Sequence, residues 1–81
     1  KCTKDLTNNN AKDNIHVYCD YTLSKDIIIP QSTIEVHPNI KFTLDKTKKL
    51  CVGQTNVFGT LYLDEGSHLR IGDETCTFTT P

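Results

Sequence analysis

Between Thr33 and Phe78 the apolar residues occur as short alternating pairs. Successive side chains of a β-strand point to opposite faces, so each pair indicates a short strand with one buried face. Turn-forming or polar residues separate nearly every pair from the next. No window longer than one turn has a helical period, so the pattern predicts an all-β protein. The pairs are Ile34/Val36, Phe42/Leu44, Leu50/Val52, Leu61/Leu63, Leu69/Ile71 and Cys76/Phe78.

The first third of the chain is less regular. Residues 1–14 are polar, and we expect them to form an N-terminal arm. Residues 15–19 alternate and predict a first strand, whereas residues 20–26 predict a turn or a polar excursion. The β-branched run 27–29 predicts a strand that ends at Pro30, because proline has no N–H to give to a sheet. With 81 residues, the chain (1–81) is expected to form a single small domain.

Two architectures fit many short strands. One is an antiparallel β-sandwich or small barrel, and the other is a β-solenoid, in which each coil stacks in parallel on the next. An offset of 27 residues aligns apolar positions about twice as often as composition predicts, which favours stacked coils. The aligned sets are Ile15/Phe42/Leu69, Val17/Leu44/Ile71, Leu23/Leu50, Ile34/Leu61 and Val36/Leu63.

Three segments resemble the short-strand-and-turn coils of right-handed parallel β-helix proteins, a class that includes secreted adhesins and polysaccharide-acting solenoids. The segments are IPQSTIEVHPNIKF (29–42), VFGTLYL (57–63) and GSHLRI (66–71), and the likeness extends from Ile27 to Phe78. The resemblance implies a short-strand β-solenoid of about three coils. Carbohydrate-lyase members of the class carry clusters of Asp, Arg or Lys on one coil face. No matching cluster occurs in this chain, so we do not expect an enzyme.

Four cysteines are spread from one end of the chain to the other: Cys2, Cys19, Cys51 and Cys76. The number is even, and neither a CxxC pair nor a zinc-finger histidine spacing occurs. Because so small a core stabilises a domain only marginally, we expect two disulfides. Disulfides imply an oxidising compartment. The chain begins at Lys1 without an apolar signal segment, so we expect a mature or excised secreted chain.

The solenoid interpretation suggests how the cysteines pair. Cys51 and Cys76 are 25 residues apart, close to one coil, which places them on neighbouring strands and leaves Cys2 to pair with Cys19. The alternation conflicts with this pairing. Cys51 lies between two inward residues, whereas Cys76 shares the inward face of its own apolar pair. Either the register slips by one residue near Thr75 or the pairing is different.

Charge and motifs exclude several functions. The net charge is −1, and the one basic run, residues 46–49, has no interleaved aromatic residues, so no nucleic-acid partner is expected. The longest apolar run, residues 27–29, is far too short to span a membrane. No Gly-x-Ser-x-Gly motif occurs, and the adjacent carboxylates at 64–65 and 73–74 are expected to lie in turns.

The three histidines, His16, His37 and His68, are predicted to point outward into solvent. In the 27-residue register His16 stacks on Thr43 and Arg70 and not on another histidine. The sequence therefore predicts no metal site, no cofactor and no catalytic residues.

The best candidates for recognition are tyrosines, because their rings combine an apolar body with a polar tip and are enriched at binding surfaces. Tyr18, Tyr21 and Tyr62, together with His68 and Arg70, are the predicted binding surface.

Two functional hypotheses follow. The first is a non-enzymatic, secreted structural or adhesive module that associates with itself, by edge or end-to-end stacking, or binds an extracellular glycan or protein. The second is a small secreted effector, a toxin-like domain or a carbohydrate-binding domain that acts as a monomer. The first predicts growth with concentration, because an uncapped solenoid leaves unpaired backbone groups at its ends.

Overall fold

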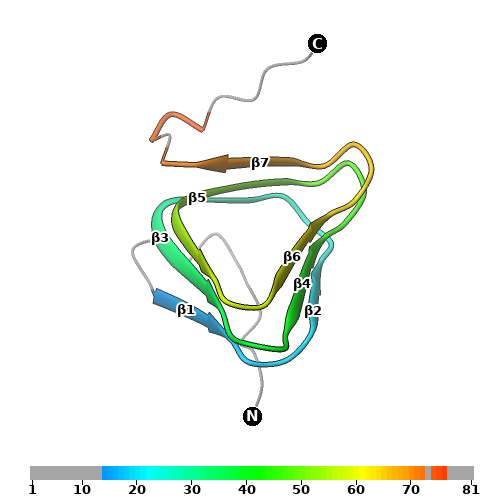
Figure 1. The fold of residues 1–81 in the computed structure, drawn as a ribbon. Helices are drawn as coiled ribbons and strands as arrows, with labels where there is room; N and C mark the ends of the chain where they lie inside the picture. The colour runs from blue at the N-terminus through cyan, green and yellow to red at the C-terminus, as the bar shows by residue number, and fades with distance from the viewer. Residues whose placement is uncertain (1–13, 73, 77–81) are drawn as a thin grey trace.

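The chain folds into a parallel β-solenoid of about three coils in the computed structural model, which describes residues 14–72 and 74–76 (Figure 1). The cysteine Cys2, the residue Phe78 and all but the last residue of the predicted arm lie outside the described residues. Every strand pair in the described part is parallel, so the antiparallel sandwich is wrong and the solenoid is confirmed.

Among the described residues, seven strands form two sheets, with the orders β1-β3-β5-β7 and β2-β4-β6. No helix occurs among the described residues, and consequently none there is long and apolar enough to cross a membrane. The strands are β1 (Asn14–Val17), β2 (Tyr21–Leu23), β3 (Ile27–Val36), β4 (Lys41–Leu44), β5 (Lys49–Val57), β6 (Thr60–Leu63) and β7 (His68–Ile71).

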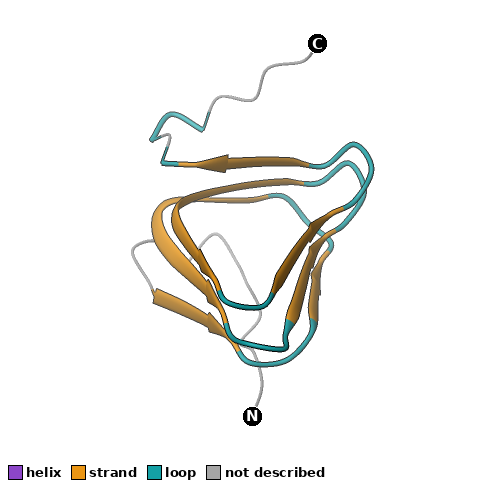
Figure 2. Ribbon diagram, viewed as in Figure 1, coloured by secondary structure: helices purple, strands orange, loops and turns teal. Residues whose placement is uncertain are grey.

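The coils have a three-sided cross-section (Figure 2). The sheet β2-β4-β6 forms one side. The larger sheet forms the other two, because β3 and β5 each bend at a corner. In β3 the bend coincides with a register shift between Ile29 and Thr33. Proline at position 30 therefore does not end the strand as predicted; it lies within β3 at this corner.

The coils are shorter than the sequence repeat suggested. Asn14 pairs with Thr33, 19 positions later, and Ile27 pairs with Leu50, 23 positions later. The 27-residue offset is therefore wrong. It aligned a strand on one side of a coil with a strand on the next side of the following coil. Apolar pairs occur on all three sides, so they coincide at that offset without being stacked.

One predicted turn contains a strand. Residues 20–26 include β2, whose Tyr21 and Leu23 both face the interior. Polar residues lie between and after Tyr21 and Leu23, so the sequence pattern was too short to predict a strand here. The ring of Tyr21 stacks on that of Phe42 in the next coil, with ring centroids 5.8 Å apart and planes 13° from parallel. Phe42 is the largest fully buried side chain in the described core.

A disulfide joins Cys51 to Cys76, as predicted from the solenoid, with the Cα atoms 5.7 Å apart. The conflict of faces disappears because Cys76 is not in a strand. It follows the turn after β7 and has a left-handed φ of 52°, so it reaches the outward side chain of Cys51. Cys19 is also disulfide-bonded. The predicted partner, Cys2, lies outside the described residues.

Two stacked turns, one after β4 and one after β6, connect the sheet β2-β4-β6 to the larger sheet. In the turn after β4, the carboxylate of Asp45 accepts hydrogen bonds from the Lys46 N–H (2.8 Å) and from the Ser24 hydroxyl in the coil below (3.1 Å). In the next coil the Asp64 carboxylate accepts the N–H of Glu65 at 2.7 Å. The prediction that residues 64–65 lie in a turn is confirmed.

The hydrogen bonds to Asp45 make this turn sensitive to acid. The Lys46 N–H, then the Ser24 hydroxyl, lower the pKa of Asp45 below its ordinary value of 3.8, and the charges of Lys48 and Lys46 add to the effect. Because the folded pKa lies below the unfolded pKa, the carboxylate stabilises the fold above pH 3.8 and loses this contribution as the pH falls through the folded value.

We therefore predict that D45N is less stable than the parent chain at neutral pH, and that the difference narrows as the pH falls below 3.8. Urea unfolding midpoints of the two proteins, measured from neutral to strongly acidic pH, test this prediction. A difference that is constant with pH would contradict it.

Candidate functional site

The most distinctive surface of the molecule is the exposed end of its last coil. Inward-facing side chains stack in columns from coil to coil, and in the second coil they are buried completely. In the third coil Val57, Leu63 and Ile71 are 40, 44 and 49% exposed. Their stacking partners one coil earlier, Val36, Leu44 and Val52, are at most 1% exposed.

The opposite end of the solenoid is covered. The inward aliphatic residues of the first coil, from Ile15 to Ile29, are no more than 7% exposed, and the inward Tyr21 is half-buried, although no described strand precedes them. Within the described part of the chain, only the end formed by the third coil therefore leaves core positions open to solvent.

The open end is also an edge of both sheets in the described part of the chain. The strands β6 and β7 are the last strands of their sheets, so each pairs with a described strand along one edge only. Phe58, at the corner between β5 and β6, is 64% exposed. A sheet edge beside exposed apolar side chains is a template for further strand pairing. We call Val57, Phe58, Leu63 and Ile71 the open-end patch.

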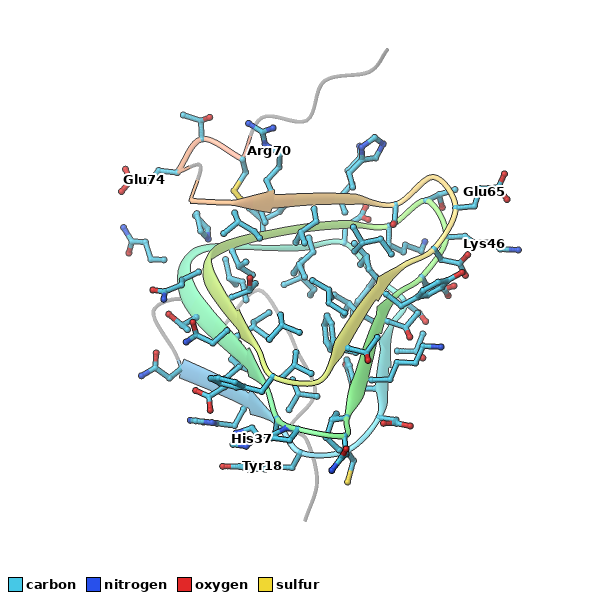
Figure 3. The ribbon with its side chains drawn as sticks, in the orientation of Figure 1. Tyr18, His37, Lys46, Glu65, Arg70 and Glu74 are labelled. Atoms are coloured by element: carbon cyan, nitrogen blue, oxygen red, sulfur yellow. A yellow bond between two sulfur atoms is a disulfide. The ribbon has the colours of Figure 1, made fainter. Side chains whose placement is uncertain are left out.

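The structure distributes the predicted binding surface over several sides of the solenoid. Tyr21 faces the interior, and Tyr62 lies on the outer face of β6 with the Lys41 Nζ 4.8 Å from its ring centroid. His68 and Arg70 lie together on β7. Tyr18 follows β1, on another side of the coil (Figure 3). Their common role in binding stays a prediction.

A second candidate site is a cluster of two imidazoles and one carboxylate on the outer face of β1 and β3. Parallel pairing puts His16 directly opposite Glu35, and His37 follows the end of β3. The distance from the His16 Nδ1 to the His37 Nε2 is 3.0 Å. The Glu35 Oε2 lies 3.3 Å from the His37 Nε2 and 3.9 Å from the His16 Nδ1.

The ring of Tyr18 packs against both imidazoles of this cluster. Its centroid is 4.3 Å from that of His37 and 5.7 Å from that of His16, with the His16 and Tyr18 planes 12° from parallel. Figure 3 shows Tyr18 and His37 side by side at the corner of the coil. The backbone N–H of His37 donates to the Val17 carbonyl at 3.2 Å, which continues the sheet ladder beyond β3. The contact with the Tyr18 ring and the hydrogen bond to the Val17 carbonyl thus both restrict the position of His37.

A polar groove of about 270 Å³ adjoins the cluster along the outer face of the same side. Its floor crosses three coils, because the lining residues come from β1, β3 and β5. Amide, hydroxyl, imidazole and carboxylate groups all face it. The lining residues are Asn14, Ile15, His16, Thr33, Glu35, Gln54 and Asn56.

The sequence analysis missed this cluster because it used the wrong coil length. In a 27-residue register His16 falls on Thr43, whereas the observed register puts it on Glu35. The missed signal is the 21-residue separation of His16 from His37. Other contacts between coils span the same separation, for example the hydrogen bond from the Lys41 N–H to the Asp20 carboxylate.

Comparison of the chain with known protein families, with curated proteins and with solved structures gives no significant match.

Proposed function

We propose that this protein is a non-enzymatic, extracellular structural or adhesive module that associates with a second copy of itself through the open end of its third coil. One observation carries the proposal: Val57, Leu63 and Ile71 occupy core columns and yet are 40 to 49% exposed. Burying apolar surface of this kind is the main driving force of protein association.

The two ends of the solenoid favour a symmetric dimer over a filament. Head-to-tail growth requires that each copy offer two open ends, but the inward aliphatic residues of the first coil are at most 7% exposed and Tyr21 is half-buried. Two copies that meet open end to open end cover both patches and leave no further apolar end. Such an isologous contact closes on itself. The edges of β6 and β7 that face no described strand can then pair across the contact.

An extracellular location is part of the proposal. The Cys51–Cys76 disulfide supports it, because such bonds persist in oxidising compartments. The contact covers one end of one coil, so the interface is small. We therefore expect a reversible dimer that forms with rising concentration.

Sedimentation velocity over about 1 to 500 µM, a range that covers weak dimers, tests the proposal. The protein is kept oxidised and in EDTA, so that neither disulfide exchange nor metal ions contribute. We predict a monomer at the lowest concentrations and a dimer at the highest. L63E is expected to raise the dissociation constant at least about tenfold, because a charge would be buried without a partner.

The matched control is Y62E. Tyr62 is the neighbour of Leu63 on β6 and is similarly exposed (47 against 44%), but it faces outward. The same charge at position 62 is expected to leave the dimer intact. A strict monomer at every concentration, or equal effects of the two substitutions, would overturn the proposal and favour a recognition domain that acts as a monomer. Growth into long rods would instead show a second open end.

A further inference from the structure

We propose that His16, Glu35 and His37 bind one divalent transition-metal ion of the zinc class. This inference is independent of the open-end dimer. It uses outward side chains of β1 and β3, in the first and second coils, whereas the open-end patch belongs to the third coil.

The spacing of the three ligand atoms fits a metal ion. The His16 Nδ1, the His37 Nε2 and the Glu35 Oε2 are separated by 3.0, 3.3 and 3.9 Å. Nitrogen and oxygen ligands bind zinc at about 2.0 to 2.2 Å in a tetrahedral arrangement, which separates neighbouring ligand atoms by about 3.3 to 3.6 Å. One ion near the centre of this triangle can therefore contact all three atoms after shifts of a few tenths of an ångström.

The chemistry of the ligands selects the class of ion. Two imidazoles and a single carboxylate are suited to zinc and to neighbouring divalent transition metals. Calcium and magnesium require oxygen ligands, of which this cluster offers only one carboxylate. Three protein ligands leave a further position for water or for a group of a bound molecule.

The fold holds the ligands before an ion arrives. His16 and Glu35 are partners in a parallel ladder, so their outward side chains are neighbours by register. The Tyr18 ring stacks on the His16 imidazole and packs in a tilted arrangement against that of His37. The cluster is also reachable from solvent, because the His16, Glu35 and His37 side chains are 41, 29 and 28% exposed. A bound ion would tie the first coil to the second.

Isothermal titration with Zn²⁺, on tag-free oxidised protein, measures the predicted affinity and stoichiometry. We expect one ion per chain, and little or no heat with Ca²⁺ or Mg²⁺ at the same concentrations. H37N and E35Q are each expected to weaken Zn²⁺ binding at least about tenfold, since losing even an outer-shell partner of a metal site costs that much. The control H68N removes an imidazole from β7, on another side of the coil, and should bind like the parent chain.

Histidine NMR signals give a second readout that needs no substitution. The chain has three histidines, so the ring signals can be assigned individually. On adding Zn²⁺, the ring signals of His16 and His37 should shift and saturate at one equivalent, while those of His68 stay in place. Equal shifts of all three rings would show non-specific binding and overturn the site, as would H37N or E35Q proteins that bind Zn²⁺ like the parent chain. Because the dimer is measured in EDTA, its failure and the failure of this site are distinguishable.

Discussion

Replacing Phe42 by alanine is expected to lower the free energy of unfolding by about 3 to 5 kcal/mol, the usual cost of removing a buried phenylalanine ring. Phe42 is 1% exposed and lies in the middle coil, where the Tyr21 ring stacks on it from below and Leu61 pairs with it from above. Neither neighbour can move inward without losing its own strand register, so the cavity stays largely unfilled.

A domain of this size has little stability in reserve, so a loss of that magnitude is expected to leave F42A largely unfolded. Urea denaturation followed by circular dichroism measures the change. The control is F58A, because Phe58 is 64% exposed at a corner of the last coil. At concentrations where the protein is monomeric, we expect F58A to change stability by no more than about 0.5 kcal/mol. Similar losses in both variants would contradict the assignment of the core.

Removing the bridge between Cys51 and Cys76 is expected to cost about 3 to 4 kcal/mol. The two cysteines are 25 residues apart, and the chain-entropy relation gives about 3.5 kcal/mol for a loop of that length. The bond holds the turn after β7 against the outer face of β5, which also keeps the Cys51 side chain fully buried.

The double substitution C51A/C76A tests this bridge without leaving an unpaired thiol. Chemical reduction would break the bond at Cys19 as well, so the substitution isolates one disulfide. We expect a lower urea midpoint and faster hydrogen exchange in β7, whose only described neighbour strand is β5. An unfolding free energy within about 1 kcal/mol of that of the parent chain would contradict the prediction.

The Cys51–Cys76 disulfide and the exposed core positions occur together in the third coil. The last coil has a strand, β7, that is supported on one edge by β5 and held from outside by the disulfide. Its inward Leu69 and Ile71 still face solvent in part. The disulfide therefore secures the last coil without covering it. This is the physical reason that the proposed dimer and the bridge are complementary: one buries the open end, and the other keeps the end in place.

The corners of the coils show constraints that no alternation pattern reveals. At Gly59 an added Cβ would lie 2.3 Å from the Ile40 carbonyl oxygen and 2.5 Å from that of His37. Both contacts are with backbone, so a side chain at this corner cannot be accommodated by a rotamer change. The preceding corner has Asn39 with a left-handed φ of 67°, a conformation that asparagine tolerates. Glycine at position 59 thus permits the close stacking of two successive corners.

Residue types and their alternation were sufficient to predict most of the local structure of this protein. Alternating apolar residues are a property of single strands, and most of the predicted pairs lie in strands with those residues facing inward. Turn-forming residues between the apolar pairs also predicted the turns after β4 and β6. The pairing of Cys51 with Cys76 followed only from the solenoid interpretation, and the alternation pattern left it in conflict until the position of Cys76 was known.

Which residues stack on one another could not be predicted from these local patterns. The coil length depends on how many residues each corner takes, and the corners are set by backbone conformations such as those of Asn39, Thr47 and Gly66. A period-two pattern is unchanged when a whole strand is moved to another side of the coil, so it contains no information about that choice. For this reason the His16, Glu35 and His37 cluster and the difference between a covered first coil and an open last coil emerged only from the three-dimensional register.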